Sequence, residues 1–233
     1  LRERPGLMRR PAALAPLPGR EPLLGPVTAA AEAAGVKPGM RMGEALATCP
    51  ELVLVEQDPA TAEDAWEAIV RRLEDSGFAV EPAELGTVYF ETRGVERLYG
   101  GVQAALHRAL AAVGAGWDAR AGAAVRRFAA LAAASVARAG QVVVVADGDQ
   151  ARDFLAPLPL TLLPLDAGRR GELQELGVQK LGQLAELPGA AVAERLGRDG
   201  RQAWTLARGR GARRVEGRRP PAEVAERLDF PGA

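Results

Sequence analysis

Cysteine and histidine are the residues best suited to nucleophilic or metal chemistry, and this chain has one of each, Cys49 and His107. A single cysteine excludes a disulfide within the chain, and the pair is too small for a Cys/His zinc site. Their wide separation gives little support to a Cys-His nucleophile. We expect Cys49, which precedes Pro50 at a helix end, to be a small buried residue. We expect His107 to be a surface or packing residue of a helix.

Arginine is concentrated near the C-terminal end of the chain. Residues 195–219 contain nine arginines against two acids, Asp199 and Glu216, whereas thirty basic residues balance thirty acidic ones overall. A local excess of guanidinium groups on turns and helices suits contacts with phosphate, so nucleic acid is modestly favoured over a merely solvated charged helix. The predicted DNA contacts are Lys180, Arg195, Arg198, Arg201, Arg208, Arg210, Arg213 and Arg214.

The stretch from Val80 to Gly101 is predicted to contain a central strand. Its segment 87–92 is rich in β-branched and aromatic residues. Many enzymes that transfer nucleotides place acidic side chains on such a strand, where two Mg²⁺ ions are held against phosphate oxygens. Here the strand begins at Leu85, and the next two residues, Gly86 and Thr87, supply no carboxylate. The sequence therefore predicts no metal site and no cofactor.

Composition sets wide limits on the fold. The chain has 233 residues, enough for one large domain or two to three small ones, and 48% of them are hydrophobic. Only 4% are aromatic, so alanine and leucine carry much of the packing. No apolar run is long enough to span a bilayer and no signal peptide is visible, which predicts a soluble, cytoplasmic protein without membrane contact. The chain starts at Leu1 rather than at a methionine, so we expect an N-terminal piece to be missing.

Strands and helices alternate over the middle of the chain. Between about 52 and 146 the pattern is strand, helix, strand, helix, strand, helix, strand, which predicts an α+β layer with helices on one face of a sheet. After Asp147 the prolines and short apolar periods predict a small all-helical domain. Near the N-terminus a short strand is predicted directly after Pro11, and a helix is predicted to end at Cys49. The other predicted elements are strands at 52–55, 87–92, 117–122 and 142–145, and helices at 27–34, 61–75, 102–113, 123–139, 149–155, 170–176, 181–187, 190–196 and 200–208.

Several segments, in this order, resemble the Y-family translesion DNA polymerases. Residues 35–40 and 49–52 resemble the end of that family's fingers, 80–94 its central palm strand, and 176–184 its helix-hairpin-helix thumb. Residues 94–101 are closer to one branch, the ImuB-like proteins of bacterial mutagenesis cassettes, and 227–231 resemble the entry to that branch's little finger. The resemblance covers nearly the whole chain.

The resemblance implies a fold and a set of domain boundaries. The implied fold is α+β, with Y-family-like fingers, a ferredoxin-like palm sheet covered by helices on one face, an all-helical helix-hairpin-helix thumb, and no little finger in this chain. The implied domains are fingers at 1–58, without the N-terminal palm strand, palm at 59–148, thumb at 149–217, and a linker at 218–233 toward a little finger that is missing here.

The nucleotide site departs from the family pattern at every position that can be compared. Active members carry an adjacent Asp-Glu pair where this chain has Gly86 and Thr87. They carry a fingers Tyr and Arg, three residues apart, where it has Ala29 and Glu32, and a triphosphate-contacting Lys that corresponds to Leu131. A carboxylate repels a polyphosphate. The resemblance therefore implies that the means of holding metal and triphosphate have been lost.

The predicted thumb departs as well. The family's first hairpin is a Gly-hydrophobic-Gly turn whose amides bind a DNA phosphate, and the corresponding turn here is Pro164-Leu165-Asp166. Proline removes an amide donor and aspartate has the wrong charge for phosphate. The arginines from 195 to 214 are then the remaining candidates for a contact with the DNA backbone.

Three functions remain open from the sequence. The first is a non-catalytic polymerase-like adaptor in DNA damage tolerance, which binds DNA weakly without sequence preference and recruits other proteins. The resemblance implies as its partners a DnaE-type error-prone polymerase (ImuC), a RecA-like accessory protein (ImuA) and the sliding clamp, although the chain contains no convincing clamp-binding segment. The second is an active template-directed translesion DNA polymerase. The third is a helical protein-interaction module with incidental arginines, which predicts no salt-sensitive DNA binding.

Overall fold

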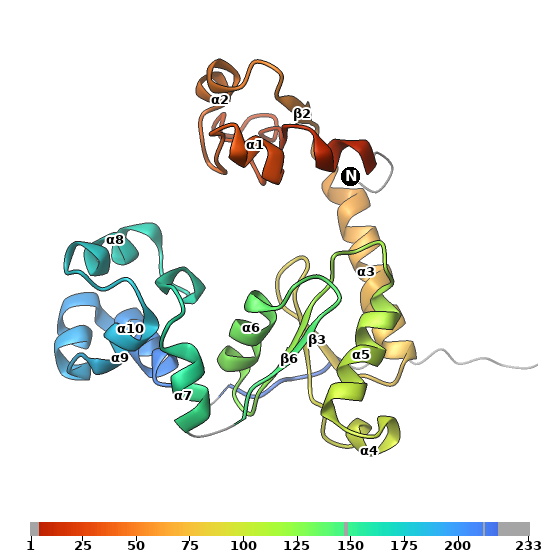
Figure 1. Cartoon of the computed structure of the whole chain (residues 1–233), viewed down its shortest axis with the longest axis vertical. Coiled ribbons are helices and arrows are strands. Elements are labelled where there is room, and N and C mark those ends of the chain that lie inside the picture. The colour runs from red at the N-terminus through yellow and green to blue at the C-terminus, as the bar shows by residue number, and fades with distance from the viewer. Residues whose placement is uncertain (1–4, 147–148, 212, 219–233) are drawn as a thin grey trace, which may run out of the picture. The chain divides into compact units, whose positions relative to one another are not determined.

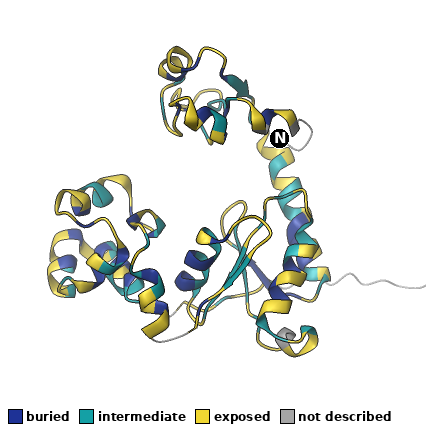
Figure 2. Ribbon diagram, in the orientation of Figure 1, coloured by how far each residue is buried: buried dark blue, intermediate teal, exposed yellow. Residues whose placement is uncertain are grey.

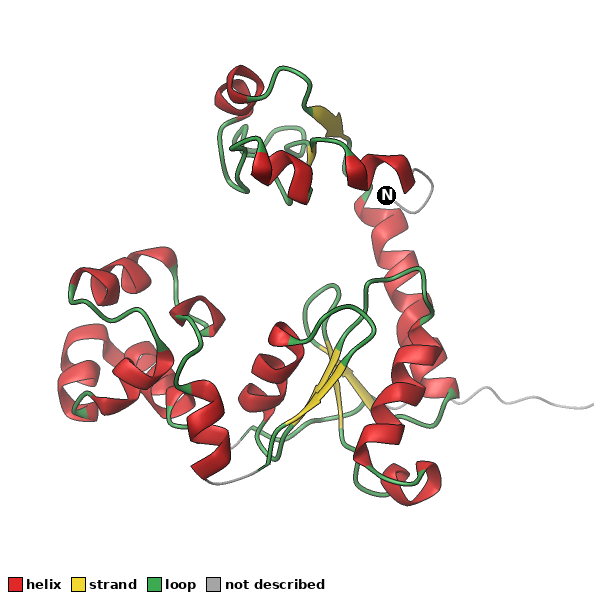
Figure 3. Cartoon of the chain, in the orientation of Figure 1, coloured by secondary structure: helices red, strands yellow, loops and turns green. Residues whose placement is uncertain are grey.

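The computed structural model describes residues 5–146, 149–211 and 213–218. The chain divides into two compact units between Ala65 and Trp66, inside helix α3 (Pro59–Asp75). Figure 1 labels the elements, and Figure 3 shows that helices and short strands are mixed, which confirms the α+β class. The boundaries proposed from the sequence for fingers, palm and thumb stay predictions, and residues 227–231 lie outside the described part of the chain.

The first unit is held together by a parallel strand pair. Its elements are η1 (Pro5–Arg9), β1 (Ala12–Leu14), α1 (Ala29–Ala33), α2 (Met42–Thr48) and β2 (Val53–Val55). Strands β1 and β2 pair with Ala12 opposite Val53. Thr28 caps α1, because its hydroxyl accepts a hydrogen bond from the amide of Ala31 at 3.3 Å and donates one to the carbonyl of Arg10 at 2.8 Å. Cys49 is buried in the core of this unit, as predicted.

The second unit begins with a layer of strands and helices. Its elements up to residue 146 are β3 (Val80–Pro82), β4 (Val88–Phe90), α4 (Val95–Tyr99), α5 (Val102–Val113), β5 (Ala121–Ala123), α6 (Arg127–Val136) and β6 (Val142–Val144). Among the described residues the strands pair two by two, β3 with β4 antiparallel and β5 with β6 parallel. The apolar faces of α3 and α5 pack with β3, and the rings of Phe78 and Phe90 lie 4.6 Å apart at their centroids. His107 is exposed on α5, in agreement with a surface role.

The central strand differs from its prediction in one respect that matters. Residues 85–87 were expected to begin the strand, but β4 starts only at Val88, and 83–87 form the turn between β3 and β4. Alternation of apolar residues cannot distinguish the end of a tight hairpin from its strand. Helix α4 was also missed, since five residues between glycines carry almost no period.

Between residues 149 and 207 the second unit is mainly helical. Its elements are α7 (Asp149–Leu155), η2 (Leu160–Leu162), α8 (Ala167–Glu175), α9 (Leu181–Glu186) and α10 (Gly189–Ala207). The helices predicted at 190–196 and 200–208 are the two halves of α10, which is kinked at Gly197, where φ is 66°.

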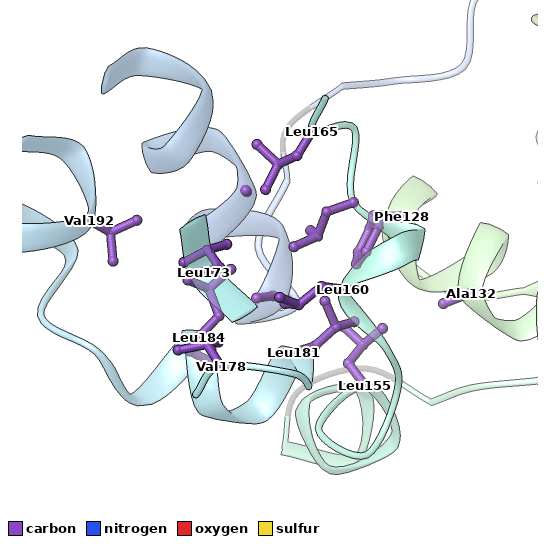
Figure 4. Close-up of a cluster of buried hydrophobic side chains, with 14 of the residues drawn as sticks. Phe128, Ala132, Leu155, Leu160, Leu165, Leu173, Val178, Leu181, Leu184 and Val192 are labelled. Atoms are coloured by element: carbon purple, nitrogen blue, oxygen red, sulfur yellow. The ribbon is translucent and has the colours of Figure 1, made fainter. Parts of the chain in front are cut away.

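A leucine-rich core joins this helical part to α6. Leu155, Leu160, Leu173, Leu181 and Leu184 are all at most 2% exposed and form one cluster with the buried face of α6. Figure 4 draws this cluster, with Phe128 and Ala132 contributed by α6, and Figure 2 shows buried positions on the inward faces of the helices. The helical part is therefore attached to the strand-and-helix layer by apolar packing against α6.

The chain that leaves α10 returns to the strand layer. Residues 213–218 have no helical or strand assignment. The amide of Arg218 donates to the carbonyl of Val80 at 2.8 Å, so this exit segment lies beside β3. Two groups of charged side chains hold it there, one around Glu81 and one around Arg218.

Candidate functional site

The turn between β3 and β4 carries the two positions where a metal site would be expected. The amide of Thr87 donates to the carbonyl of Glu84 at 2.8 Å, and the amide of Ala83 donates to the carbonyl of Thr87 at 3.0 Å. Gly86 has φ +89°, a conformation that side chains with a Cβ rarely adopt. The backbone of the turn is therefore suited to glycine at position 86.

These residues offer little to a divalent cation. Gly86 has no side chain, and Thr87 has a neutral hydroxyl, whereas Mg²⁺ at a phosphate-transfer site is held by carboxylates. Over the residues that the structure describes, no group of three or more His, Cys, Asp or Glu side chains is arranged to hold a metal ion. Gly86 and Thr87 therefore supply no carboxylate to a metal ion at this turn.

The other positions implied by the resemblance lie on helices of the two units. Ala29 and Glu32 are both exposed, one turn apart on α1 of the first unit. Leu131 is half-buried on α6 of the second unit, where its carbonyl accepts a hydrogen bond from the hydroxyl of Ser135. None of the three side chains can donate a hydrogen bond to a phosphate.

Residues 164–166 have a structural role at the start of α8. Leu165 is 5% exposed and belongs to the leucine core. The carboxylate of Asp166 caps the helix, because it accepts a hydrogen bond from the amide of Arg169 at 2.8 Å and pairs with that residue's guanidinium at 3.0 Å. The amide hydrogen bond from Arg169 lowers the pKa of Asp166. A carboxylate in this use keeps negative charge at the turn, which disfavours a phosphate contact there.

Four of the predicted DNA contacts gather around one hollow. Arg198, Arg201, Arg210 and Arg213 line a cavity of about 370 Å³ between the second half of α10 and the segment that follows it. We call this hollow the arginine pocket. All four side chains are exposed.

The remaining predicted contacts lie elsewhere. Arg195 on α10 and Arg214 in the exit segment are exposed outside the pocket, and Lys180 precedes α9, where its amide donates to the side chain of Gln183. Arg208 is half-buried, donates to the carbonyl of Ala185 at 3.0 Å and lies over the ring of Trp204. Of the predicted arginine contacts, four therefore line the arginine pocket, Arg195 and Arg214 lie elsewhere on the surface, and Arg208 packs against the helical part.

The sequence reasoning missed Glu81, which anchors the exit segment. Its carboxylate accepts hydrogen bonds from Arg127 at 2.6 Å, from Arg213 at 2.8 Å and from the amide of Glu216 at 2.8 Å. The hydrogen bond from Arg127 is the main cause that lowers the pKa of Glu81, and burial acts in the opposite direction. Arg127 also lies 3.6 Å over the ring of Tyr89. The signal in the sequence was a charged residue inside a buried strand, which requires a partner.

Arg218 forms the second anchor. Its guanidinium donates to the carboxylate of Glu74 at 2.6 and 2.9 Å and to that of Glu67 at 2.9 and 3.0 Å. Both glutamates lie on α3, one face of which therefore receives the exit segment. These hydrogen bonds, first those to Glu74, raise the pKa of Arg218, while Arg218 lowers the pKa of Glu67. Fork-shaped pairing of this kind fixes direction as well as distance.

The fold defined by these elements is that of the Y-family DNA polymerases. DinB from Sulfolobus solfataricus superposes with a TM-score of 0.71 at 19% identity, over 91% of this chain and 64% of that one. A Y-family polymerase chimera of Dbh gives a TM-score of 0.70 at 18% identity, over 94% of this chain and 67% of the other. The impB/mucB/samB family model matches residues 1–147, and the chain belongs to that family.

Similar curated sequences include both a protein named ImuB and proteins named DNA polymerase IV. Protein ImuB of Caulobacter vibrioides is 31% identical over 196 residues, which are 84% of this chain and 42% of that protein. DNA polymerase IV of Dehalococcoides mccartyi is 30% identical over 198 residues, 83% of this chain and 50% of the relative. The chain thus spans about half the length of these relatives. Within the described residues, no helix has the length and apolar character needed to cross a membrane.

Proposed function

We propose that the chain is part of a non-catalytic, polymerase-like adaptor in DNA damage tolerance, which binds the DNA backbone without sequence preference. The observation that carries the proposal is the turn at Gly86 and Thr87, where a glycine with positive φ and a neutral hydroxyl occupy the positions at which the resemblance implies two carboxylates in active polymerases. Catalysis of phosphoryl transfer rests on positioning and on metal-borne charge. Gly86 and Thr87 supply no carboxylate that could hold such a charge.

The positions that would hold the triphosphate support the same function. Ala29, Glu32 and Leu131 provide no cation and no hydrogen-bond donor toward a phosphate. The similarity to protein ImuB supports an accessory role. The proposed partners, implied by the sequence resemblance, are an error-prone DnaE-type polymerase (ImuC), the RecA-like ImuA and the sliding clamp. The proposed location of this assembly is the cytoplasm.

DNA binding is supported by the arginines of the second unit. Arg198, Arg201 and Arg210 have exposed guanidinium groups that form no ion pair with any carboxylate of the described residues. Such groups are free to contact phosphates, and contacts of this kind make affinity fall steeply as salt rises.

An active translesion polymerase is the alternative function. The observation that favours it is the 30% identity to DNA polymerase IV, which is nearly the same as the identity to ImuB. Overall identity does not discriminate here, because catalytic residues are a small part of the aligned length.

Primer extension separates the two. The purified chain is incubated with a primer-template, all four deoxynucleotides and Mg²⁺, beside the Dehalococcoides mccartyi polymerase IV as the positive control. We expect no incorporation by this chain, while it binds the same DNA with a strong salt dependence. Incorporation that is lost on chelation of Mg²⁺ would overturn the adaptor proposal. Absence of both incorporation and DNA binding would favour a protein-interaction module.

A further inference from the structure

The arginine pocket is built from two parts of the chain. Arg198, Arg201 and Thr205 follow one another at helical spacings of three and four residues, so one face of α10 forms the first wall. Arg210 and Arg213, from the segment after the helix, form the second wall. Gln202 adds an amide that can donate hydrogen bonds, whereas the hydroxyl of Thr205 already donates to the carbonyl of Arg201 at 2.8 Å.

Three of the four pocket arginines have no ion-pair partner among the described residues. Asp199, the acid closest in sequence, pairs with Arg169 of α8. Of the four pocket arginines only Arg213 has an ion-pair partner among the described residues, and this is Glu81 at 2.8 Å. Several guanidinium groups facing one hollow of about 370 Å³ repel each other unless an anion lies between them. Guanidinium groups bind phosphate through paired hydrogen bonds.

The second wall of the pocket is held in place by ion pairs and hydrogen bonds to the strand layer. Glu81 is 9% exposed and holds both the guanidinium of Arg213 and the amide of Glu216. Arg218, at the end of the exit segment, pairs with Glu67 and Glu74 of α3. The side chain of Arg213 is still 74% exposed, so its other N–H groups remain available to a ligand. A wall that is ordered before binding loses less conformational entropy on binding.

We propose that the arginine pocket binds a phosphate group, and that Glu81 is a positioning residue of this site, acting through Arg213. The phosphate belongs either to the backbone of DNA or to a free polyphosphate, both of which present the same charged oxygens. In its DNA form the inference rests on the proposed function, and it names the place where the backbone is held. Arg195 and Arg214, which lie outside the pocket, are excluded from that place.

The first experiment compares two variants of equal charge. Arg198→Gln with Arg201→Gln removes two pocket cations, and Arg108→Gln with Arg120→Gln removes two exposed cations that are neither pocket residues nor predicted DNA contacts. Binding of a fluorescent primer-template is measured by anisotropy at about 50 and about 200 mM salt. We expect the pocket variant to bind about tenfold more weakly, with a salt slope reduced by about 0.9 for each phosphate that it no longer neutralises. The control variant should stay within about twofold of the wild type.

The outcomes separate the site from the proposed function. Equal losses in both variants, or no loss in the pocket variant, overturn the pocket as the place that holds the backbone. If the wild type binds no DNA, the DNA-binding part of the proposed function fails, and calorimetry with inorganic triphosphate decides on the site. Binding of triphosphate by the wild type, lost in the pocket variant, then supports a free polyphosphate as the ligand. No heat of binding in the wild type overturns the phosphate site as well.

The role of Glu81 is tested by a double-mutant cycle on the same ligand. Glu81→Gln is expected to lower affinity about threefold in the wild-type background and to have no further effect when Arg213→Gln is present. A merely structural role would lower affinity equally in both backgrounds. Equal losses, no change, or a gain in affinity from the removed negative charge would each overturn positioning through Arg213.

Discussion

Glu81 shows how one carboxylate can join parts of the chain that are far apart in sequence. It accepts hydrogen bonds from Arg127, Arg213 and the amide of Glu216, and the ion pair with Arg213 spans 132 residues. A buried carboxylate is stable only when its oxygens are satisfied. Glu81 is therefore a position where a small chemical change should affect both the strand layer and the exit segment.

We expect Glu81→Gln to destabilise the chain by about 1–3 kcal/mol at pH 7, because the amide that replaces one oxygen cannot accept hydrogen bonds from arginine. The pKa of Glu81 is lowered in the folded state, so the contribution of its ionised form is present above the ordinary glutamate pKa of about 4.3. It is lost as pH falls through the folded-state value. Urea unfolding at pH 7 and at about pH 3.5 should therefore show a smaller difference between wild type and variant at the lower pH.

Glu84→Gln is the matched control, since Glu84 is exposed at the turn and its side chain has no ion-pair partner among the described residues. Its stability should follow that of the wild type at both pH values. A gap for Glu81→Gln that stays constant with pH would contradict the role of the ionised carboxylate.

Gly122 is a second position where one atom decides the packing. A Cβ built on it would lie 2.3 Å from the amide nitrogen of Ala134 and 2.4 Å from the carbonyl oxygen of Ala130, both backbone atoms of α6. We expect Gly122→Ala to cost about 3 kcal/mol by urea unfolding, because the helix must move off β5. Gly171→Ala on α8, where a Cβ meets nothing within 4 Å, should instead be neutral or slightly stabilising. Equal effects of the two substitutions would show that α6 does not lie against β5 in this way.

At the scale of elements, the sequence predicts best the longer helices, whose repeating apolar residues lie within one continuous segment. Helices α3, α5 and α7 were predicted within two residues of their ends, because their apolar spacing and flanking residues agree. Helix α10 was predicted as two helices, since the glycine at its kink also resembles a helix end. The turn at 83–87 could not be separated from the strand that follows it, because its hydrogen bonds, rather than its side chains, define it.

Helix α9 provides a test of the helical core at this scale. Leu181 is completely buried in the cluster that joins α9 to α7 and α6. We expect Leu181→Ala to lower the free energy of unfolding by about 2–5 kcal/mol, because apolar surface is no longer buried and a cavity is left behind. Leu176→Ala, at a side chain that is 52% exposed, should change it by less than about 0.5 kcal/mol. A small effect at Leu181 would indicate that the helical part is not packed as described.

At the scale of the molecule, the family resemblance supplied the fold, and the contacts between distant segments supplied the candidate site. The sequence identifies the arginines, but it does not predict which of them line the pocket and which lie elsewhere on the surface. That division depends on the kink in α10 and on the return of the chain to Glu81. Local patterns carry no information on such pairings. They are also the contacts that make the second unit self-contained.

Because these contacts lie within the second unit, we predict that residues 58–218 fold as an independent fragment. The buried clusters of the second unit draw their members from residues 69–207, and the start at Asp58 retains the hydrogen bond that its carboxylate accepts from the amide of Thr61 at 3.0 Å. We expect a cooperative thermal transition by circular dichroism, together with DNA affinity within about threefold of the whole chain, because the arginine pocket is complete in this fragment.

A shorter fragment, residues 58–211, tests what the exit segment contributes. It lacks Arg213, Glu216 and Arg218, so Glu81 loses two of its three donors, and Glu67 and Glu74 lose their shared partner. Since a partly buried carboxylate without its donors is costly, the transition of the shorter fragment should lie about 2–4 °C below that of 58–218 for each kcal/mol lost. Equal midpoints would mean that the returning segment adds no stability to the strand layer, and an unfolded 58–218 would mean that the second unit depends on the first.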